Sequence, residues 1–328
     1  MTLCNFSIVV RLCCLALTIG CGSDGLDQIP LSSLPTENVE AHVLVTGLDT
    51  PWDMVMAPDG WIWFTERPGF VSRVDTSSGM VERIHTLPAT QVAESGLMGM
   101  TLHPDFPVEP IVYLVYSYTD GNVIYNRLAS WRYDGEGLVD RDILVDLIPG
   151  GRFHNGSRLA IGPDRYLYMT TGDAQQQPLA QDIFSNAGKV LRLSLDGQPL
   201  DENPFQNEVF SYGHRNAQGL VFHPQTQDLY ITEHGPQDND EINRVVWGGN
   251  YGWPAVRGFC DNDVADLDEI TFCSENNVVE PVWTWTPTIA PSGADFYDGD
   301  LFPEWRGSLL FTTLKAATLY RVQISEDG

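Results

Sequence analysis

Short runs of β-branched and aromatic residues, separated by turn residues, extend along the chain from about residue 41. Residues 111–116 and 166–171 are examples, and each run has Gly, Pro or Asp close by on either side. Such runs are typical of β-strands. No window has the spacing of a convincing amphipathic helix. The pattern therefore predicts an all-β protein.

One strand pattern recurs, in which a turn containing Pro precedes an aromatic and apolar strand that often ends in Thr. Clear copies occupy residues 58–65, 163–170 and 224–232, and looser copies occupy residues 104–116 and 303–312. The five prolines are 46, 59, 61 and 79 residues apart. All-strand repeats of about 40 to 60 residues indicate a β-propeller with one four-stranded antiparallel sheet per blade. An irregular β-sandwich is the alternative.

The N-terminal segment has the features of an export signal. Residues 1–20 contain one basic residue, Arg11, and no acidic residue. The apolar run at residues 12–19 is too short to span a bilayer permanently, which favours a cleaved signal.

The junction before Cys21 resembles a bacterial lipoprotein signal, although Thr18 stands where Leu is usual. We therefore expect a periplasmic protein, lipid-anchored through Cys21, with an ordinary secretory signal as the alternative. The expected organisation is an export signal at 1–21, a polar tether at 22–40 and a propeller domain at 41–328.

Charge and cysteine content narrow the function further. The chain of 328 residues has a formal net charge of −26, which argues against nucleic-acid binding. It suits an exported protein that binds cations and neutral or cationic substrates. After removal of the signal and lipidation of Cys21, only Cys260 and Cys273 remain as thiols. We expect them to form a disulfide, because neither has a second Cys or His at zinc-site spacing.

An acidic loop at residues 234–243 directly follows the apolar strand 229–232. It contains Asp238, Asp240 and Glu241, and a turn at residues 248–254 comes next. Hard cations bind clustered oxygen atoms, including main-chain carbonyls, at about 2.3–2.6 Å. The loop therefore favours a calcium site, and a solvated acidic loop is the alternative.

His154 lies in a glycine-rich turn at residues 150–156, and the strand that follows leads to Asp173. In a propeller this hairpin can bring Asp173 back beside His154. A carboxylate against a ring nitrogen fixes the tautomer and raises the basicity of the imidazole, as a general base requires. A surface histidine is the alternative.

Other charged or polar groups also lie in loops that enter or leave repeated strands. Arg215 and Asn216 precede the fourth copy, Lys315 follows the strand 309–314, and Glu94 precedes the second copy. Propeller sites are built from such loops. The combination suggests a polyanionic cofactor, whereas an arginine that ties two blades together is the structural alternative.

From Leu48 to Val322 the chain resembles the soluble quinoprotein glucose (glucose/sorbosone) and aldose sugar dehydrogenases. The motifs that carry the resemblance are Pro51-Trp-Asp53, Thr65-Glu-Arg-Pro-Gly69, Glu94-Ser-Gly-Leu-Met-Gly99 with His103-Pro-Asp-Phe106, His154-Asn-Gly156 with Gly172-Asp173, Gly213-His-Arg-Asn216, and the acidic loop. These enzymes are six-bladed propellers that hold calcium and pyrroloquinoline quinone. The resemblance implies a six-bladed propeller of four-stranded blades.

The resemblance also implies roles for individual residues. His154 would take the proton of the sugar C1 hydroxyl as hydride passes to the quinone, and Asp173 would orient it. The cofactor-binding positions would be Glu94, Arg215, Asn216 and Lys315. The carbonyls of Gly235 and Pro236 would hold one calcium ion, and Asp240, Glu241 and the carbonyl of Tyr251 a second. Glu94 stands where the glucose enzymes carry Gln, which favours the aldose sugar enzymes of broader specificity.

The chain departs from the family after Lys315. The family continues to an arginine-containing segment and another Pro-Asp-Gly repeat, whereas this chain ends at Gly328. Five repeats stand where six blades are expected, so we expect an incomplete last blade, through truncation or by nature. The favoured function is a quinone-dependent aldose dehydrogenase, as a monomer or homodimer. The alternatives are a calcium-stabilised propeller that binds a sugar or protein without redox turnover, and a propeller hydrolase or lactonase.

Overall fold

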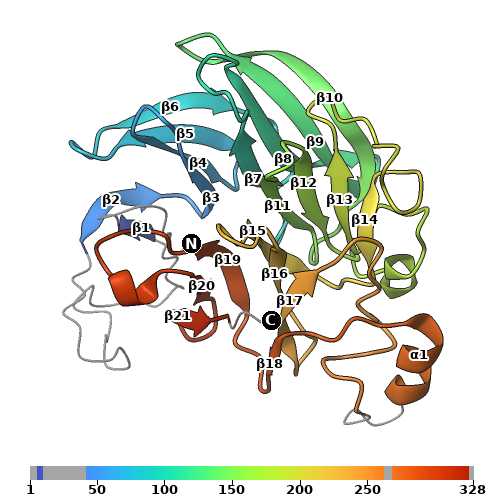
Figure 1. Ribbon diagram of the computed structural model, residues 1–328. Coiled ribbons are helices and arrows are strands. Elements are labelled where there is room, and N and C mark those ends of the chain that lie inside the picture. The colour runs from blue at the N-terminus through green and yellow to red at the C-terminus, as the bar shows by residue number, and fades with distance from the viewer. Residues whose placement is uncertain (1–5, 10–41, 262–267, 325–328) are drawn as a thin grey trace.

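The computed structural model describes residues 6–9, 42–261 and 268–324. Its strands form antiparallel sheets arranged around a common axis (Figure 1). The predicted lipidation site Cys21 and the predicted tether lie outside the described residues. Within the described ranges, no helix is long and apolar enough to cross a membrane.

Four sheets contain four strands each, and each sheet uses four strands that are consecutive in the chain. The first sheet contains β3 (Pro51–Met56), β4 (Trp61–Glu66), β5 (Phe70–Asp75) and β6 (Val81–Thr86). The second contains β7 (Leu97–Leu102), β8 (Ile111–Asp120), β9 (Val123–Tyr133) and β10 (Leu138–Pro149). The third contains β11 (Gly156–Ile161), β12 (Leu167–Thr171), β13 (Lys189–Leu193) and β14 (Val209–Tyr212). The fourth contains β15 (Ala217–Phe222), β16 (Leu229–Glu233), β17 (Asp240–Val245) and β18 (Trp283–Trp285).

The fifth sheet is smaller, and a two-stranded sheet accompanies it. The fifth contains β19 (Pro291–Phe296), β20 (Ser308–Thr313) and β21 (Thr318–Gln323). The two-stranded sheet pairs β1 (Phe6–Val9) with β2 (Val43–Leu48). The first strands of the five larger sheets, β3, β7, β11, β15 and β19, are innermost and follow one another around the axis (Figure 1).

The predicted all-β propeller architecture is confirmed, and the described residues form five larger sheets, so the sixth blade stays a prediction. Each of the five recurring prolines lies in the turn between the first and second strand of one sheet, so five repeats build five sheets. Between β19 and β3 the described residues place only the two-stranded β1–β2 sheet (Figure 1).

Aromatic and aliphatic side chains fill the space between neighbouring sheets. Trp63 of β4 is fully buried and meets two rings of the second sheet edge-on, with centroids 5.8 Å from Phe106 and 4.9 Å from Tyr133. Burial of apolar surface contributes about 25 cal/mol per Å², and edge-on aromatic pairs add to it. The sheets therefore hold one another in place and fix the loops at their ends.

An ion pair joins the sheets at the axis. Arg158 of β11 donates to the carboxylate of Asp53 on β3, and its Nε donates to the carbonyl of Gln218 on β15 at 2.9 Å. Its guanidinium also lies 4.2 Å above the ring of Trp52. Asp53 in turn accepts the main-chain N–H of Met100 on β7 at 2.9 Å. Four inner strands are thus linked by one buried polar cluster.

The structure contains a short helix that the sequence analysis did not anticipate. Helix α1 (Glu269–Asn276) begins after Asp268, whose side chain accepts the N–H of Thr271. It is too short to show a helical pattern in the sequence. The other helical elements in the described part of the chain are two single-turn 3₁₀ segments, η1 (Gln177–Ala180) and η2 (Pro303–Trp305). The predicted disulfide between Cys260 and Cys273 is present and ties α1 to the preceding loop.

Candidate active site

The predicted site residues gather at one end of the propeller axis because of the strand order. Glu94, His154 and Arg215 with Asn216 precede the inner strands β7, β11 and β15. Asp173, Gly235 and Lys315 follow the second strands β12, β16 and β20. The first two strands of each sheet are antiparallel, so the start of one and the end of the next lie together. A cavity of about 810 Å³ runs along the axis, and its lining includes Glu94, Asn155 and His234.

His154 and Asp173 are hydrogen-bonded, with His154 Nδ1 2.8 Å from Asp173 Oδ1. The backbone of His154 is left-handed, with φ of 60°. Its carbonyl approaches Gly172 so closely that a Cβ there would lie 1.9 Å from it, so only glycine fits. Asp173 is fully buried, whereas the His154 side chain is 16% exposed. Within the described ranges no residue is hydrogen-bonded to His154 Nε2.

Glu94 and Asn216 hold the turn that contains His154. One oxygen of Glu94 accepts the main-chain N–H of His154 at 2.8 Å and the side-chain amide of Asn216 at 3.4 Å. The amide oxygen of Asn216 accepts the N–H of Gly156 at 3.1 Å. The structure therefore brings together four of the predicted residues, which come from three different sheets.

Arg215 lies beside this group, and one of its hydrogen-bond donors has no partner among the described residues. Its Nη1 donates to the carbonyl of His234 at 2.9 Å, whereas its buried Nε has no partner among the described residues. Burial lowers the pKa of Arg215, and the nearby charges of Asp173, Glu233, Glu94 and Asp240 oppose that shift. An unpaired buried donor is costly, so Arg215 suits an anionic or carbonyl-bearing ligand.

Asp240 connects the acidic loop to the fifth sheet. One carboxylate oxygen accepts the N–H of Gly235 at 2.8 Å, and the other accepts the N–H groups of Ile289 and Ala290 at 2.6 Å each. Asp240 therefore stabilises the segment that leads into β19. Its proposed contact with calcium stays a prediction.

Glu241 lies in a region that is rich in oxygen atoms, and its own two oxygens accept the side-chain amide of Asn243 and the N–H of Gly258. Arg215 and Arg257 line the same region. Glu241 borders a small cavity of about 10 Å³, also lined by Glu233, Pro236 and Tyr251, which is about the size of one water or ion. Burial, followed by the charge of Glu233, raises the pKa of Glu241 to about 8.

Two further buried oxygens in this region, on the side chains of Asp238 and Asn243, have no partner among the described residues. No group of three or more His, Cys, Asp or Glu side chains gathers for a metal in the described part of the chain. Calcium readily uses main-chain carbonyls beside carboxylates. The donor set around Glu241 therefore fits one such ion.

Lys315 stands apart from the other predicted cofactor residues. Its Nζ donates to the hydroxyl of Thr288, and its main-chain N–H donates to the carbonyl of Ile289 at 3.3 Å. The same segment donates the N–H groups of Ile289 and Ala290 to the carboxylate of Asp240. Lys315 thus borders the site through residues 288–290 and makes no direct hydrogen bond to Arg215 or Asn216 in the described structure.

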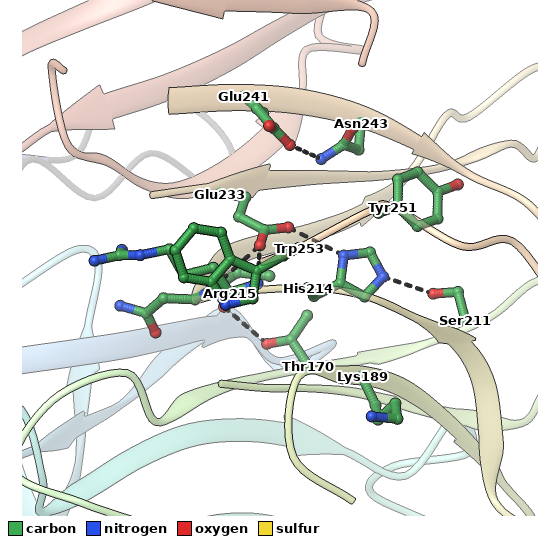
Figure 2. A network of polar contacts seen from close by, with 12 residues as sticks. Thr170, Lys189, Ser211, His214, Arg215, Glu233, Glu241, Asn243, Tyr251 and Trp253 are labelled. Carbon is green, nitrogen blue, oxygen red and sulfur yellow. Dashed lines mark hydrogen bonds and ion pairs between the residues drawn. The ribbon is translucent and has the colours of Figure 1, made fainter. Parts of the chain in front are cut away.

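A buried hydrogen-bond network behind Arg215 was not predicted from the sequence. Figure 2 shows the carboxylate of Glu233 between His214 and the main chain of Arg215. Glu233 accepts the N–H groups of Arg215 and Asn216, and its other oxygen lies 3.0 Å from His214 Nδ1. His214 Nε2 is 2.8 Å from the hydroxyl of Ser211. His214 stands inside the Gly213-His-Arg-Asn216 motif, which was the available signal.

Two more buried polar residues were missed. His234 Nε2 donates to the carbonyl of Pro291 at 2.7 Å, and burial lowers the pKa of His234. The ammonium of Lys189 donates to the carbonyls of Leu179, Ala180 and Ala187 at 2.8, 2.9 and 2.6 Å. Lys189 thereby ties down the loop that follows Asp173. A lone His or Lys gives no sequence signal for such a contact.

A family model and individual relatives both assign the chain to the same protein family. The family model described as Glucose / Sorbosone dehydrogenase matches residues 48–328. Quinoprotein glucose dehydrogenase B of Acinetobacter calcoaceticus is 31% identical, over 88% of this chain and 78% of that protein. Aldose sugar dehydrogenase YliI of Escherichia coli is 32% identical, over 89% of this chain and 82% of that protein.

Solved structures agree with the sequence comparison. The PQQ-bound form of aldose sugar dehydrogenase from Streptomyces coelicolor is 33% identical with a TM-score of 0.74, and the match covers 86% of this chain and 80% of that chain. The shared fold, the match over nearly all residues after 47 and the named relatives confirm the resemblance. The chain therefore belongs to the glucose/sorbosone dehydrogenase family.

Proposed function

We propose that this protein oxidises the C1 hydroxyl of aldose sugars to the lactone, with His154 as the general base. The observation that carries the proposal is the His154–Asp173 pair. When His154 is neutral, its Nδ1–H donates to Asp173 and its Nε2 lone pair remains available to accept the hydroxyl proton. Relatives named for glucose and aldose sugars support this substrate class.

The cofactor in this proposal is pyrroloquinoline quinone, which when bound accepts the hydride from the sugar C1 carbon. Arg215, Asn216 and Lys315 would hold its anionic and carbonyl oxygens, and Glu94 would border it. The unpaired Nε of Arg215 and the axial cavity lined by Glu94 support this placement. A PQQ-bound relative supports the cofactor class.

The proposal includes calcium at two places. The carbonyls of Gly235 and Pro236 would hold one ion beside the cofactor, and Asp240, Glu241 and the carbonyl of Tyr251 would hold the other. The support is the raised pKa of the buried Glu241 and the buried oxygens of Asp238 and Asn243 that have no partner among the described residues. A divalent cation there would offset the repulsion between Glu233 and Glu241.

We further propose that the protein is exported and lipid-anchored through Cys21. The apolar run and the Gly-Cys junction at the N-terminus support this localisation. Radiolabelled palmitate should enter the wild-type chain and not a Cys21→Ala variant expressed in bacteria. Equal labelling of the two would contradict the anchor.

The decisive experiment is reconstitution of the purified chain with calcium and pyrroloquinoline quinone, followed by dye reduction with a panel of aldoses. We expect sugar-dependent turnover that falls by about 10³-fold in His154→Ala, because general-base catalysis contributes about 10²–10⁴-fold. Quinone binding, followed by absorbance, should persist in the variant. Quinone-independent sugar binding without turnover would instead favour the calcium-stabilised binding propeller.

A further inference from the structure

Trp253 makes the third hydrogen bond to the carboxylate of Asp173. Its indole Nε1 donates to Asp173 Oδ2 at 2.8 Å. The other oxygen accepts from His154 Nδ1 at 2.8 Å and from the N–H of Gln175 at 2.7 Å. Both oxygens of a fully buried carboxylate are thus occupied, so its plane and direction are fixed.

The same indole also lies against Arg215. The guanidinium of Arg215 is 5.3 Å from the ring centroid of Trp253, and that of Arg257 is 5.9 Å away. Figure 2 shows Trp253 beside Arg215 and in front of the Glu233 network. Cations at this range are attracted to the indole face. The Trp253 side chain therefore contacts both Asp173, the partner of the proposed general base, and Arg215, which is proposed to bind the cofactor.

The backbone around Trp253 is anchored on both sides. Its N–H donates to the carbonyl of Gly213 at 3.0 Å, and its carbonyl accepts the side-chain amide of Gln181 at 2.8 Å. Trp253 is only 5% exposed. Its indole therefore has little freedom to move away from Asp173.

We propose that Trp253 is a positioning residue with two separable roles, and this inference rests on the function proposed above. The indole N–H holds Asp173 in the orientation that keeps His154 in its Nδ1–H form. The indole face holds the Arg215 guanidinium toward the cofactor. Without the N–H, a buried carboxylate oxygen loses the one donor that it has among the described residues, and Asp173 would turn to regain one at the expense of His154.

Two substitutions separate the roles. Trp253→Phe removes the N–H and keeps a ring face, whereas Trp253→Leu removes both. Trp247→Phe is the matched control, because Trp247 is exposed and its indole donates one hydrogen bond to the carbonyl of Glu202 at 2.9 Å. Thermal unfolding of all three variants shows whether each one folds.

Kinetics and quinone binding give the first readout on the reconstituted protein. We expect Trp253→Phe to lower kcat by about tenfold, with the KM for sugar and the affinity for pyrroloquinoline quinone within about twofold of wild type. Trp253→Leu should in addition weaken quinone binding by about tenfold. Trp247→Phe should change none of these quantities. A folded Trp253→Phe with wild-type kcat would overturn the proposal.

Histidine ¹⁵N NMR gives a second readout that does not depend on turnover. The wild-type spectrum should show His154 with its proton on Nδ1, and Trp253→Phe should shift population to the other tautomer. An unchanged tautomer in Trp253→Phe would overturn the positioning role. If wild-type protein fails to oxidise any aldose, the proposed function fails, whereas the NMR comparison still decides the role of Trp253.

Discussion

Two histidine–carboxylate pairs lie close together in this protein and differ in what surrounds the second ring nitrogen. His154 and Asp173 are joined through Nδ1 at 2.8 Å, and His214 and Glu233 are joined through Nδ1 at 3.0 Å. The second ring nitrogen of His214 is bound to Ser211, and the ring is fully buried and stacked on Tyr251 at 4.6 Å. His154 is partly exposed and keeps its second nitrogen without a partner in the described structure.

A hydrogen bond to a carboxylate is therefore not sufficient to make a histidine a general base. In both pairs the carboxylate can hold the ring proton on Nδ1, which leaves the lone pair on Nε2. Of the two, only the Nε2 of His154 faces no hydrogen-bond donor among the described residues. At His214 that lone pair is already used inside the structure, so the pair stabilises the loop that carries Arg215 and Asn216. The position of each ring relative to solvent decides its role.

The largest expected effect comes from Asp173→Asn. If the amide oxygen stays toward the indole N–H of Trp253, the NH₂ group faces His154 Nδ1, and the N–H of Gln175 loses the oxygen to which it donates at 2.7 Å. His154 then carries its proton on Nε2 and cannot accept the sugar proton. We expect kcat to fall by about 10³-fold, as removal of general-base catalysis would predict, and the free energy of unfolding to fall by about 1–3 kcal/mol because the N–H of Gln175 loses its acceptor.

This prediction is checked by steady-state dye reduction together with thermal unfolding. A folded Asp173→Asn protein that retains more than about a tenth of wild-type kcat would show that the His154 tautomer does not limit turnover. Glu233→Gln is the matched substitution in the second pair.

In Glu233→Gln the same tautomer change is expected to be tolerated. The amide oxygen still accepts hydrogen bonds from the N–H groups of Arg215 and Asn216, and the NH₂ group faces His214 Nδ1. His214 Nε2–H can then donate to Ser211, because a hydroxyl both donates and accepts. Loss of the negative charge should lower the free energy of unfolding by about 2 kcal/mol, with kcat within about threefold of wild type.

Urea unfolding and dye reduction test this variant side by side with Asp173→Asn. Equal losses of kcat in the two variants would remove the distinction between the pairs. A large loss of quinone affinity in Glu233→Gln would instead show that Glu233 acts mainly through Arg215.

The smallest expected effect concerns a buried carboxylate with no histidine partner. Asp295 on β19 accepts only the N–H of its neighbour Phe296, at 2.8 Å, among the described residues, and burial raises its pKa from 3.8 to about 6. The folded state then holds this proton more tightly than the unfolded state. Its contribution to stability is present below about pH 4 and is lost as the pH rises through about 6.

Asp295→Asn keeps the group neutral at every pH and should remove this dependence. Between pH 4 and pH 7, wild type should lose about 2 kcal/mol of unfolding free energy relative to the variant. Urea unfolding across that range measures the difference. Parallel curves for the two proteins would show that Asp295 ionises freely in the folded state.

The sequence was informative wherever contacts are local to one hairpin. Pro163 and the strand after it predicted the turn that returns the chain to His154, and Asp173 does lie beside that histidine. Cys260 and Cys273 are 13 positions apart and form the expected disulfide. In each case a short connection leaves few alternative arrangements, so the pattern of residues is sufficient.

Contacts between sheets were not predictable in this way. Trp253 is 80 positions from Asp173, and Glu94 is 60 positions from His154. The loop pattern singled out Glu94, and the resemblance gave it a cofactor-binding role, but neither predicted its contact with His154 or singled out Trp253 or Glu233 for the site. A tryptophan in a glycine-rich turn and a glutamate at a strand end give no signal of a distant partner. The described strands form five larger sheets around the axis, and the sixth blade that the resemblance implies stays a prediction.

The sequence by itself determined the repeated strand–turn–strand units, the acidic loop, the family, and which loops carry histidine, arginine and lysine. These features depend on local periodicity and turn chemistry, which each segment specifies alone. Only the tertiary structure decided that His154 keeps a ring nitrogen unpaired while His214 does not, and that one indole joins Asp173 to Arg215. Those outcomes depend on how five sheets pack around one axis, because that packing sets which side chains are buried and which partners they meet.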